Sequence, residues 1–411
     1  MSEQRCRHCR TPLKLMLADL GSAPPSNAYL SAEDLEAPEV WYPLRVLVCE
    51  HCWLVQTQDF ACAEALFRPD YAYFSSVSTT WLDHAERYVA TMVERFGLDA
   101  GHRVVEIAAN DGYLLQYVQA CGIPCFGIEP TAATAAAARA KGLTIIETFF
   151  GLDLAETLST QGQQADLIVA NNVLAHVPNI DDFVRGIARL LKPHGLATFE
   201  FPHLLRLLAE TQFDTLYHEH FSYLALGVVE RIFQANGLSV FDVEEWPTHG
   251  GSLRVYVQRA DTGVQLCQTR VAALRQQERA AGLETPEVYA GFQTRAETIR
   301  HDLLCFLLQA RQAGQQVVAY GAAAKGNTLL NYAGVRPDLL PYVVDRNPAK
   351  QGRYLPGSRI PIVDESRLAE TRPDYVLILP WNLRDEVRRQ LDYIRAWSGQ
   401  FVTAVPRLEQ I

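Results

Sequence analysis

Short apolar runs alternate with helical patterns along most of the chain from residue 73 onward. Residues 78–97 predict a helix that ends at Gly97, and the apolar run 104–108 predicts the strand that follows it. Further strands are expected at 125–129, 143–147, 166–172 and 196–201, with helices over 114–120, 131–141 and 180–191. Strands that alternate with helices are typical of a parallel sheet covered on both faces. We therefore predict an α/β domain over residues 73–262.

A second pattern of the same kind fills the last third of the chain. Residues 264–313 contain few helix breakers and predict a long helical stretch. Residues 316–333 then begin a new strand–loop–helix unit, and 341–347 and 375–381 have the composition of further buried strands. The sequence therefore predicts a second, Rossmann-like α/β domain over residues 263–411.

The first 72 residues differ from the rest, because they show little helical periodicity and contain two C-x-x-C pairs. Each pair places two thiolates on one side of a tight loop, so Cys6, Cys9, Cys49 and Cys52 can complete a tetrahedral Zn²⁺ site. Four thiolates leave no open position for catalysis, which makes the zinc structural. A redox dithiol, or His8 or His51 in place of one cysteine, are the alternatives. Residues 1–72 are thus predicted to be a zinc-binding domain.

Composition narrows the class of protein and its surroundings. The chain has 411 residues, of which 48% are hydrophobic and 20% charged, and its net charge is −10. Without a run of Lys or Arg, nucleic acid is a poor candidate partner. The other five cysteines are scattered, and neither an apolar signal segment nor an 18-residue apolar run is present. We expect a soluble, cytoplasmic protein without a membrane partner, a monomer or small homo-oligomer.

The strand 104–108 leads into the loop E-I-A-A-N-D-G, which is the first candidate binding site. Ligands of open parallel sheets bind beyond the carboxyl ends of the strands, and small residues let the backbone approach them. Glu129 ends the next strand, where a carboxylate can accept hydrogen bonds from ribose hydroxyls. The dinucleotide fingerprint G-x-G-x-x-G is absent, so a cofactor without a pyrophosphate is favoured over NAD. The alternative is a tight turn capped by Asn110 or Asp111.

The segment D-T-L-Y-H-E-H-F-S-Y-L, residues 214–224, is the densest polar and aromatic cluster in the chain. Its spacing does not match H-E-x-x-H, so a metal site is a weak alternative. A histidine can take a proton from a carbon next to a carbonyl, a neighbouring Glu can orient its ring, and Tyr hydroxyls can donate to an enolate oxygen. General acid–base chemistry is therefore the favoured interpretation, and a surface loop the other. After the fourth strand, Asn171 and His176 are candidates to touch cofactor or substrate.

Basic residues follow two strands of the C-terminal domain. Lys325 lies in G-A-A-A-K-G-N-T, which is not a Walker loop but places small residues at a helix N-terminus. Arg346, Lys350 and Arg353 follow the next strand. A diphosphate suits such a set, and solvated surface charges are the alternative.

The order of these motifs over nearly the whole chain resembles the deoxysugar C-methyltransferases of antibiotic and cell-envelope pathways. The matching residues are the two C-x-x-C pairs, D-L-G-x-x-P-x-x-N-x-x-L (19–30), E-I-x-x-N-D-G, Y-H-E-H-F-S-Y-L, G-x-x-x-K-G-N and N-P-x-K-Q-G. The resemblance implies a zinc-binding domain, an S-adenosylmethionine-binding domain and a Rossmann-like C-terminal domain. The substrates of that family are keto-sugars carried on a nucleoside diphosphate, commonly dTDP-4-keto-6-deoxyhexoses that are methylated at C-3.

The resemblance also implies roles for residues. His220 is the expected catalytic base, supported by Tyr217 and Glu219. The cofactor is expected along Glu106, Ala108, Asn110, Asp111 and Gly112, with Glu129 on its ribose and Asn171 near its methionine part. Substrate contacts are expected from His176, Tyr223, Lys325, Asn327, Lys350 and Arg353.

Two positions depart from the family pattern. Relatives carry Gly where Ala108 and Ala109 stand, and a Tyr where Val77 stands; Tyr73 or Tyr71 could supply the lost contact. Taken together, the sequence predicts methyl transfer from S-adenosylmethionine to a carbon beside the ketone of a nucleotide-linked keto-sugar. An O- or N-methyltransferase and a non-catalytic zinc-containing adaptor remain as alternatives, whereas an RNA methyltransferase conflicts with the acidic charge.

Overall fold

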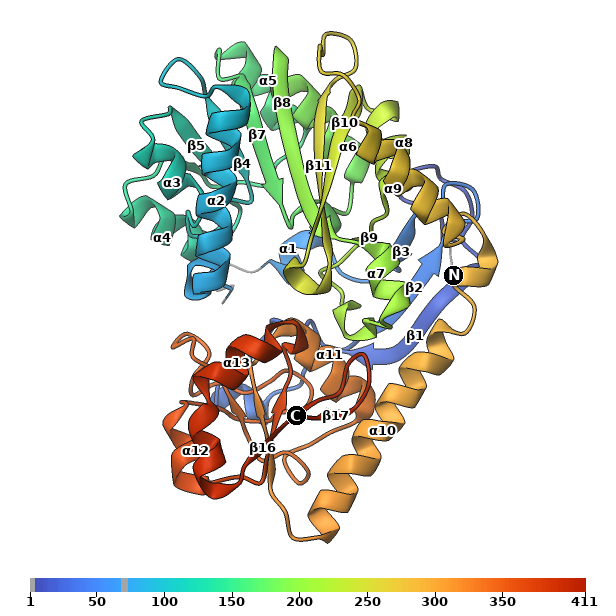
Figure 1. The fold of residues 1–411 in the computed structure, drawn as a ribbon, viewed down its shortest axis with the longest axis vertical. Helices are drawn as coiled ribbons and strands as arrows, with labels where there is room; N and C mark the ends of the chain where they lie inside the picture. The colour runs from blue at the N-terminus through green and yellow to red at the C-terminus, as the bar shows by residue number, and fades with distance from the viewer. Residues whose placement is uncertain (1–3, 68–72) are drawn as a thin grey trace.

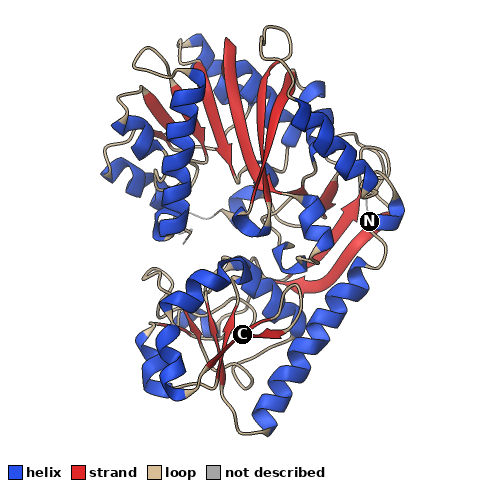
Figure 2. Cartoon of the chain, in the orientation of Figure 1, coloured by secondary structure: helices blue, strands red, loops and turns tan. Residues whose placement is uncertain are grey.

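A computed structural model describes residues 4–67 and 73–411, which fold around three sheets (Figure 1). A four-stranded sheet has the order β1-β2-β3-β9, a seven-stranded sheet β10-β11-β8-β7-β4-β5-β6, and a six-stranded sheet β14-β13-β12-β15-β16-β17. Helices lie on both sides of the two larger sheets (Figure 2). The predicted fold class is therefore confirmed. No helix in the described part of the chain has the length and apolar character needed to cross a membrane.

The seven-stranded sheet is parallel through its first five strands in sequence. These are β4 (Val104–Ile107), β5 (Cys125–Ile128), β6 (Ile145–Ile146), β7 (Ala165–Asn171) and β8 (Leu191–Pro202). The helices around it are α2 (Thr79–Phe96), α3 (Leu115–Ala120), α4 (Ala132–Ala140), α5 (Leu152–Thr160), α6 (Ile180–Leu190), α7 (Leu204–Ala209) and α8 (Leu226–Ala235). Gly97 ends α2 in a left-handed conformation, as its sequence position predicts.

The far edge of this sheet is an antiparallel pair that the sequence analysis did not anticipate. Strands β10 (Leu238–Trp246) and β11 (Ser252–Arg259) pair with each other, and β11 also pairs antiparallel with β8. A short turn, Thr248–Gly250, joins them at the carboxyl end of β8. The hairpin thus brings residues 248–250 to the sheet edge where ligands of parallel sheets bind.

The six-stranded sheet forms the C-terminal part of the molecule. Its strands are β12 (Val317–Tyr320), β13 (Val343–Val344), β14 (Ile362–Val363), β15 (Tyr375–Ile378), β16 (Gln400–Thr403) and β17 (Glu409–Gln410), and its helices α11 (Ala324–Ala333), α12 (Ser366–Thr371) and α13 (Arg384–Gln390). The helical stretch expected at 264–313 is in fact two helices, α9 (Thr269–Ala280) and α10 (Phe292–Gln312). Gly282 and Gly291, both with positive φ, and Pro286 between them interrupt it.

The N-terminal sheet joins all parts of the chain. It contains β1 (Leu15–Ala23), β2 (Tyr42–Val48) and β3 (Val55–Thr57), with α1 (Ala63–Leu66) after it, and its fourth strand is β9 (Ser222–Tyr223). On the other side, β1 packs on α10 and α11, and Leu30 forms a bridge with Tyr354. One buried apolar cluster runs through all three sheets and includes Val46, Phe199 and Ala319.

A buried ion-pair network fixes β8, β11 and α2 to one another. Glu200 accepts hydrogen bonds from Arg254 at 2.8 Å and Thr248 at 3.0 Å, and His84 lies 2.9 Å from the same carboxylate. Arg254 also covers the Tyr88 ring at 4.7 Å. Glu200 is fully buried, and burial by itself raises the pKa of its carboxyl group. His84 and Arg254 outweigh this effect and lower that pKa to about 2.

We expect Arg254→Met to lower the apparent free energy of unfolding by about 3–5 kcal/mol, because it leaves a buried carboxylate without its main counter-charge. Arg259 is the matched control on the same strand, since it pairs with the exposed Asp261. Arg259→Met should cost less than about 1 kcal/mol. Guanidinium unfolding of both variants tests this, and equal losses would contradict it.

Candidate functional site

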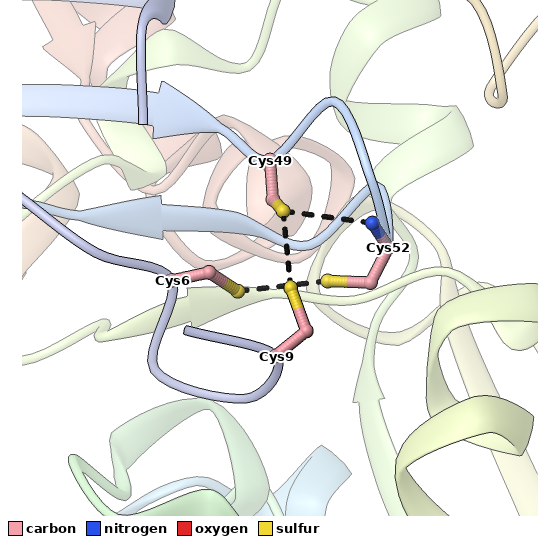
Figure 3. A group of neighbouring side chains, drawn as sticks. All are labelled: Cys6, Cys9, Cys49 and Cys52. Carbon is pink, nitrogen blue, oxygen red and sulfur yellow. Dashed lines mark hydrogen bonds between the residues drawn. The ribbon is translucent and has the colours of Figure 1, made fainter. Parts of the chain in front are cut away.

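The four predicted zinc ligands converge at one point (Figure 3). All four sulfur atoms lie within 4.8 Å of one another, with Cys6 and Cys52 at 3.5 Å and Cys9 and Cys49 at 3.4 Å. Tetrahedral zinc with Zn–S bonds of about 2.3 Å sets sulfurs about 3.8 Å apart, so the set fits the ion. His8 is hydrogen-bonded to Asp181 at 2.8 Å instead, and does not replace a cysteine.

A chain of contacts connects this cluster to β3. Gln56 in β3 donates to Cys6 Sγ at 3.3 Å and accepts from the Arg7 backbone N–H at 2.9 Å. The Arg7 guanidinium donates to the Thr57 carbonyl at 3.0 Å and lies over the Phe221 ring at 5.4 Å. The zinc site therefore holds the residues of β3 and touches the 214–224 segment.

The 214–224 segment has little regular structure and is held mainly by β3. Val55 pairs with Tyr223 and Gln56 with Ser222, and the Thr57 hydroxyl donates to the His220 carbonyl at 3.0 Å. His220 is thus positioned by the Thr57 hydroxyl, and by the backbone pairing of Ser222 and Tyr223 with a strand more than a hundred residues away.

The His220 ring has a defined protonation state. Its Nδ1 lies 2.9 Å from the Thr215 carbonyl, which can only accept, so Nδ1 carries the proton. Its Nε2 lies 2.7 Å from the Tyr217 hydroxyl, which therefore donates to it. Burial, and after it any positive charge on His176, lowers the pKa of His220 well below its usual range. The ring is neutral and its Nε2 is a base.

Glu219 does not orient this ring, contrary to the expectation from the sequence. Its Oε2 accepts a hydrogen bond from the Asn27 amide at 2.6 Å, and the atom on His220 Nδ1 is the Thr215 carbonyl. Glu219 instead connects the 214–224 segment to residues 23–31 of the N-terminal part. Asn27 is a residue that sequence reasoning missed, although it stands in the D-L-G-x-x-P-x-x-N-x-x-L motif.

Two predicted substrate residues lie beside His220. The His176 ring is 4.6 Å from the His220 ring, and burial lowers its pKa to about 4. The Tyr223 ring lies 6.0 Å from His220 on another side. His176 Nδ1 and the Tyr223 hydroxyl are buried and make no hydrogen bond within the described chain. Both are neutral polar groups available to a ligand.

The predicted cofactor loop folds sharply after β4. Ala108, Asn110 and Gly112 have positive φ values of 57°, 49° and 75°. Glu129 accepts from the Asn110 backbone N–H at 2.9 Å and from that of Thr131 at 3.0 Å. A carboxylate has about four acceptor positions, so Glu129 can also accept from a ribose hydroxyl.

The segment 73–78 covers one side of this loop. The Ser75 backbone N–H donates to Asn110 Oδ1 at 2.9 Å, and that of Ser76 to Asp111 Oδ2 at 3.2 Å. Val77 points outward with 51% of its surface exposed, whereas Tyr73 is 44% exposed and burial of its hydroxyl end raises its pKa. Tyr71, the other residue considered for the missing tyrosine contact, lies outside the described residues.

Within residues 4–67 and 73–411, several buried acceptors without a hydrogen-bond partner gather at the carboxyl ends of β4 and β7. They include Asp111 Oδ1, Asn171 Oδ1 and Asn172 Oδ1. Burial also raises the pKa of Glu106, at the end of β4, well above its usual range, so that it is neutral. S-adenosylmethionine offers an amino group, ribose hydroxyls and an adenine amine as donors, so this set of acceptors fits it.

The predicted C-terminal residues divide into two groups. Lys325 donates to Asn382 at 2.7 Å and lies over the Trp381 ring at 4.5 Å, facing the 214–224 segment, and burial lowers its pKa. Lys350 is buried and donates to the Ala322 carbonyl at 2.8 Å, so its ammonium is already bound within the protein.

The remaining two residues also differ in surroundings. Asn327 is buried and donates to the Ser26 carbonyl at 2.6 Å, which connects the C-terminal domain to residues 23–31. Arg353 is half-buried, and its predicted contact with the substrate stays a prediction. Sequence reasoning missed Trp381, whose indole donates to Asp214 at 2.7 Å, because only the fold brings these two residues together.

Comparison with known proteins agrees with this arrangement. Residues 6–67 match a family described as a zinc binding domain, 81–243 a methyltransferase domain, and 247–406 a C-methyltransferase C-terminal domain. The chain is 33% identical over 401 residues to the C-methyltransferase NovU of Streptomyces niveus, covering 98% of this chain and 95% of that protein.

Two more distant matches concern part of the chain. A ubiquinone biosynthesis O-methyltransferase of Chelativorans sp. (strain BNC1) is 31% identical over 97 residues, 23% of this chain and 38% of that protein. The magnesium protoporphyrin IX methyltransferase ChlM of Synechocystis PCC 6803 covers 44% of this chain and 79% of its own, with 15% identity and a TM-score of 0.34. NovU alone among these three matches the whole length.

Cys49→Ser should remove most of the roughly one zinc ion per chain and lower the melting temperature, because three thiolates no longer close the tetrahedron. Cys62→Ser is the matched control, since Cys62 is exposed and outside the cluster. Metal content by mass spectrometry and a thermal melt test this. A Cys49→Ser protein with full zinc content would contradict the assignment.

Ala108→Gly should stabilise the protein by up to about 1 kcal/mol, because a left-handed alanine costs about 1–2 kcal/mol and glycine loses part of that gain in the unfolded chain. Ala109→Gly should destabilise by about 1 kcal/mol, since Ala109 is fully buried without positive φ and its methyl lies where glycine would leave a gap. Chemical unfolding of the two neighbours gives opposite signs if the loop is as described.

Proposed function

The chain belongs to the zinc-binding, S-adenosylmethionine-dependent C-methyltransferases, the family of NovU, and from this premise we propose its substrate and its base. The substrate is a 4-keto-deoxysugar carried on a nucleoside diphosphate, dTDP by preference, and the methyl group goes to a carbon beside the ketone. The observation that carries this proposal is the neutral His220 with a basic Nε2.

The chemistry requires a carbon nucleophile. S-adenosylmethionine supplies an electrophilic methyl group, and a carbon beside a ketone becomes nucleophilic only after it loses a proton. His220 Nε2 takes that proton, while the Thr215 carbonyl on Nδ1 fixes the tautomer and stabilises the imidazolium that forms. A positioned base of this kind contributes about 100- to 10,000-fold to the rate.

Tyr217 has to release Nε2 before the base can act. Its hydroxyl occupies this atom in the structure, and burial raises its pKa well above the usual range, so the group stays a neutral donor. When a ketone enters the crevice, the hydroxyl can turn from Nε2 to the substrate. Tyr217 then acts as a donor to the substrate rather than as the base.

The C-terminal domain supplies the contacts to the nucleoside diphosphate in this proposal. Arg353 and Asn327 stand on the two segments of that domain that follow β12 and β13, and Lys325 brings a positive charge between Asp214 and His220. Lys350 acts indirectly, by holding the Ala322 carbonyl and thus the turn before α11. Val77 leaves room beside the cofactor loop where relatives carry a tyrosine, which allows a different sugar to be accepted.

His220→Asn should abolish methylation, with a loss of at least about 100-fold in kcat, and leave the thermal shift caused by S-adenosylmethionine unchanged. The assay is mass spectrometry of products from a panel of dTDP-, GDP- and CDP-linked keto-sugars. His218→Asn is the matched control in the same segment, because its ring contacts the carbonyls of Tyr42 and Pro43 and faces away from His220. It should retain activity.

Deuterium exchange separates this chemistry from simple loss of binding. With S-adenosylhomocysteine in place of the methyl donor, the wild type should exchange the C–H beside the ketone with solvent deuterium, and His220→Asn should not. Exchange at the wild-type rate in His220→Asn would overturn its role as base. Absence of both exchange and methylation with every sugar in the panel would overturn the substrate class.

A further inference from the structure

The turn between β10 and β11 places a histidine with a left-handed backbone conformation, His249, at the carboxyl end of β8. His249 has φ 55°, and Gly250 and Gly251 after it have φ 89° and 113°. A left-handed conformation is uncommon for a histidine and costs free energy, and residues kept in such conformations cluster at functional sites.

The surrounding structure fixes this turn firmly. The Thr248 hydroxyl donates to the buried Glu200 at 3.0 Å, and the Ser252 hydroxyl donates to the Thr248 carbonyl at 2.9 Å. A Cβ at Gly250 would lie 2.4 Å from the Trp381 ring, so the C-terminal domain packs directly on the turn. The strain at His249 is therefore maintained by contacts on both sides.

The side chain of His249 is also oriented. Its Nε2 lies 3.3 Å from the Asn172 amide nitrogen, and Asn172 itself has a left-handed φ of 52° at the end of β7. If the amide donates to Nε2, the ring proton sits on Nδ1. Nδ1 makes no hydrogen bond within the described part of the chain, and burial lowers the pKa of the ring to about 4. His249 is thus a neutral donor with an unused N–H.

Trp381 connects the turn of His249 to the segment of His220. Its ring packs against Gly250, and its indole donates to Asp214 at 2.7 Å, next to the Thr215 carbonyl that holds His220 Nδ1. Burial lowers the pKa of His220, and a positive charge on His176, His249 or Lys325 lowers it further. The charged groups around His249 itself are Lys325, Glu200, His84 and His176, and the Trp81 ring lies 5.1 Å away. Lys325 is already bonded to Asn382 and the Tyr217 hydroxyl lies on His220 Nε2, whereas Nδ1 of His249 has no hydrogen bond within the described residues and can donate to a substrate beside the Tyr217 and Tyr223 hydroxyls.

We propose that the Nδ1–H of His249 donates a hydrogen bond to the ketone oxygen of the substrate and stabilises the enolate formed there, a role that rests on the proposed function. As His220 removes the proton, the C–H electron pair forms the new C=C bond and the carbonyl π pair moves onto the oxygen. His249 keeps its proton throughout and only strengthens its hydrogen bond as the oxygen becomes negative. A neutral imidazole suits this task, because it donates without first having to be charged.

His249→Gly and His249→Asn form a matched pair of variants, because glycine and asparagine both tolerate left-handed backbone. Asparagine retains an N–H donor and glycine removes it. His249→Gly should lower kcat, and the rate of deuterium exchange with S-adenosylhomocysteine bound, by about 100- to 1,000-fold. His249→Asn should recover at least about tenfold of that loss, and the thermal shift with S-adenosylmethionine should stay as in the wild type.

The outcomes distinguish this inference from the proposed function. If the wild type methylates a keto-sugar and His249→Gly exchanges deuterium within about threefold of it, the role of His249 is wrong and the function stands. If glycine and asparagine are equally impaired and both lose cofactor binding, His249 is structural and the inference falls. If the wild type neither exchanges nor methylates any sugar, the proposed function fails, and this inference with it.

Discussion

The pairing of β3 with β9 is the interaction on which the catalytic region depends. Residues 214–224 contain hardly any regular structure, yet the role proposed for His220 requires its ring to be placed with an accuracy of a fraction of an ångström. Two residue pairs between β3 and β9, and the hydrogen bond from the Thr57 hydroxyl to the His220 carbonyl, supply that accuracy. Strand β3 is in turn fixed by Gln56, which bonds to Cys6. The zinc site has no open coordination position, so its contribution is mechanical: through Gln56 it fixes β3, the inner strand against which the short edge strand β9 pairs.

Burial and the neighbouring charges account for the neutral state of the His220 ring. His176, His249 and Lys325 each disfavour a proton on His220, and burial does so more strongly. The imidazole is therefore neutral while the crevice holds no substrate. A developing enolate changes this balance, because its negative charge favours the imidazolium beside it. The same neighbours that lower the basicity of His220 at rest would stabilise the enolate, so the proton moves only when the substrate is in place.

The sequence predicted the two α/β domains and the four cysteines well, since both follow from local patterns: apolar runs of strand length between helices, and thiols at metal-binding spacing. It failed where distant segments meet. Nothing near Ser222 in the sequence indicates that this residue completes the N-terminal sheet. Glu219 is the neighbour of His220 in sequence, yet it bonds to Asn27, and the carbonyl of Thr215 contacts the His220 ring instead. The hairpin β10–β11 does carry an alternating pattern, with T-H-G-G at its turn, and could have been recognised.

Residues 23–31 leave the N-terminal sheet and run against both other parts of the molecule: Asn27 bonds to Glu219, Ser26 to Asn327, and Leu30 pairs with Tyr354. Because this N-terminal segment packs on the C-terminal domain, the chain cannot be divided into domains that are exchanged independently. Shuffling of substrate-recognition regions among relatives, whether by evolution or in the laboratory, has to transfer this strip together with the C-terminal domain. If the C-terminal domain binds the substrate as proposed, specificity is inherited as a discontinuous unit rather than as a contiguous block of sequence.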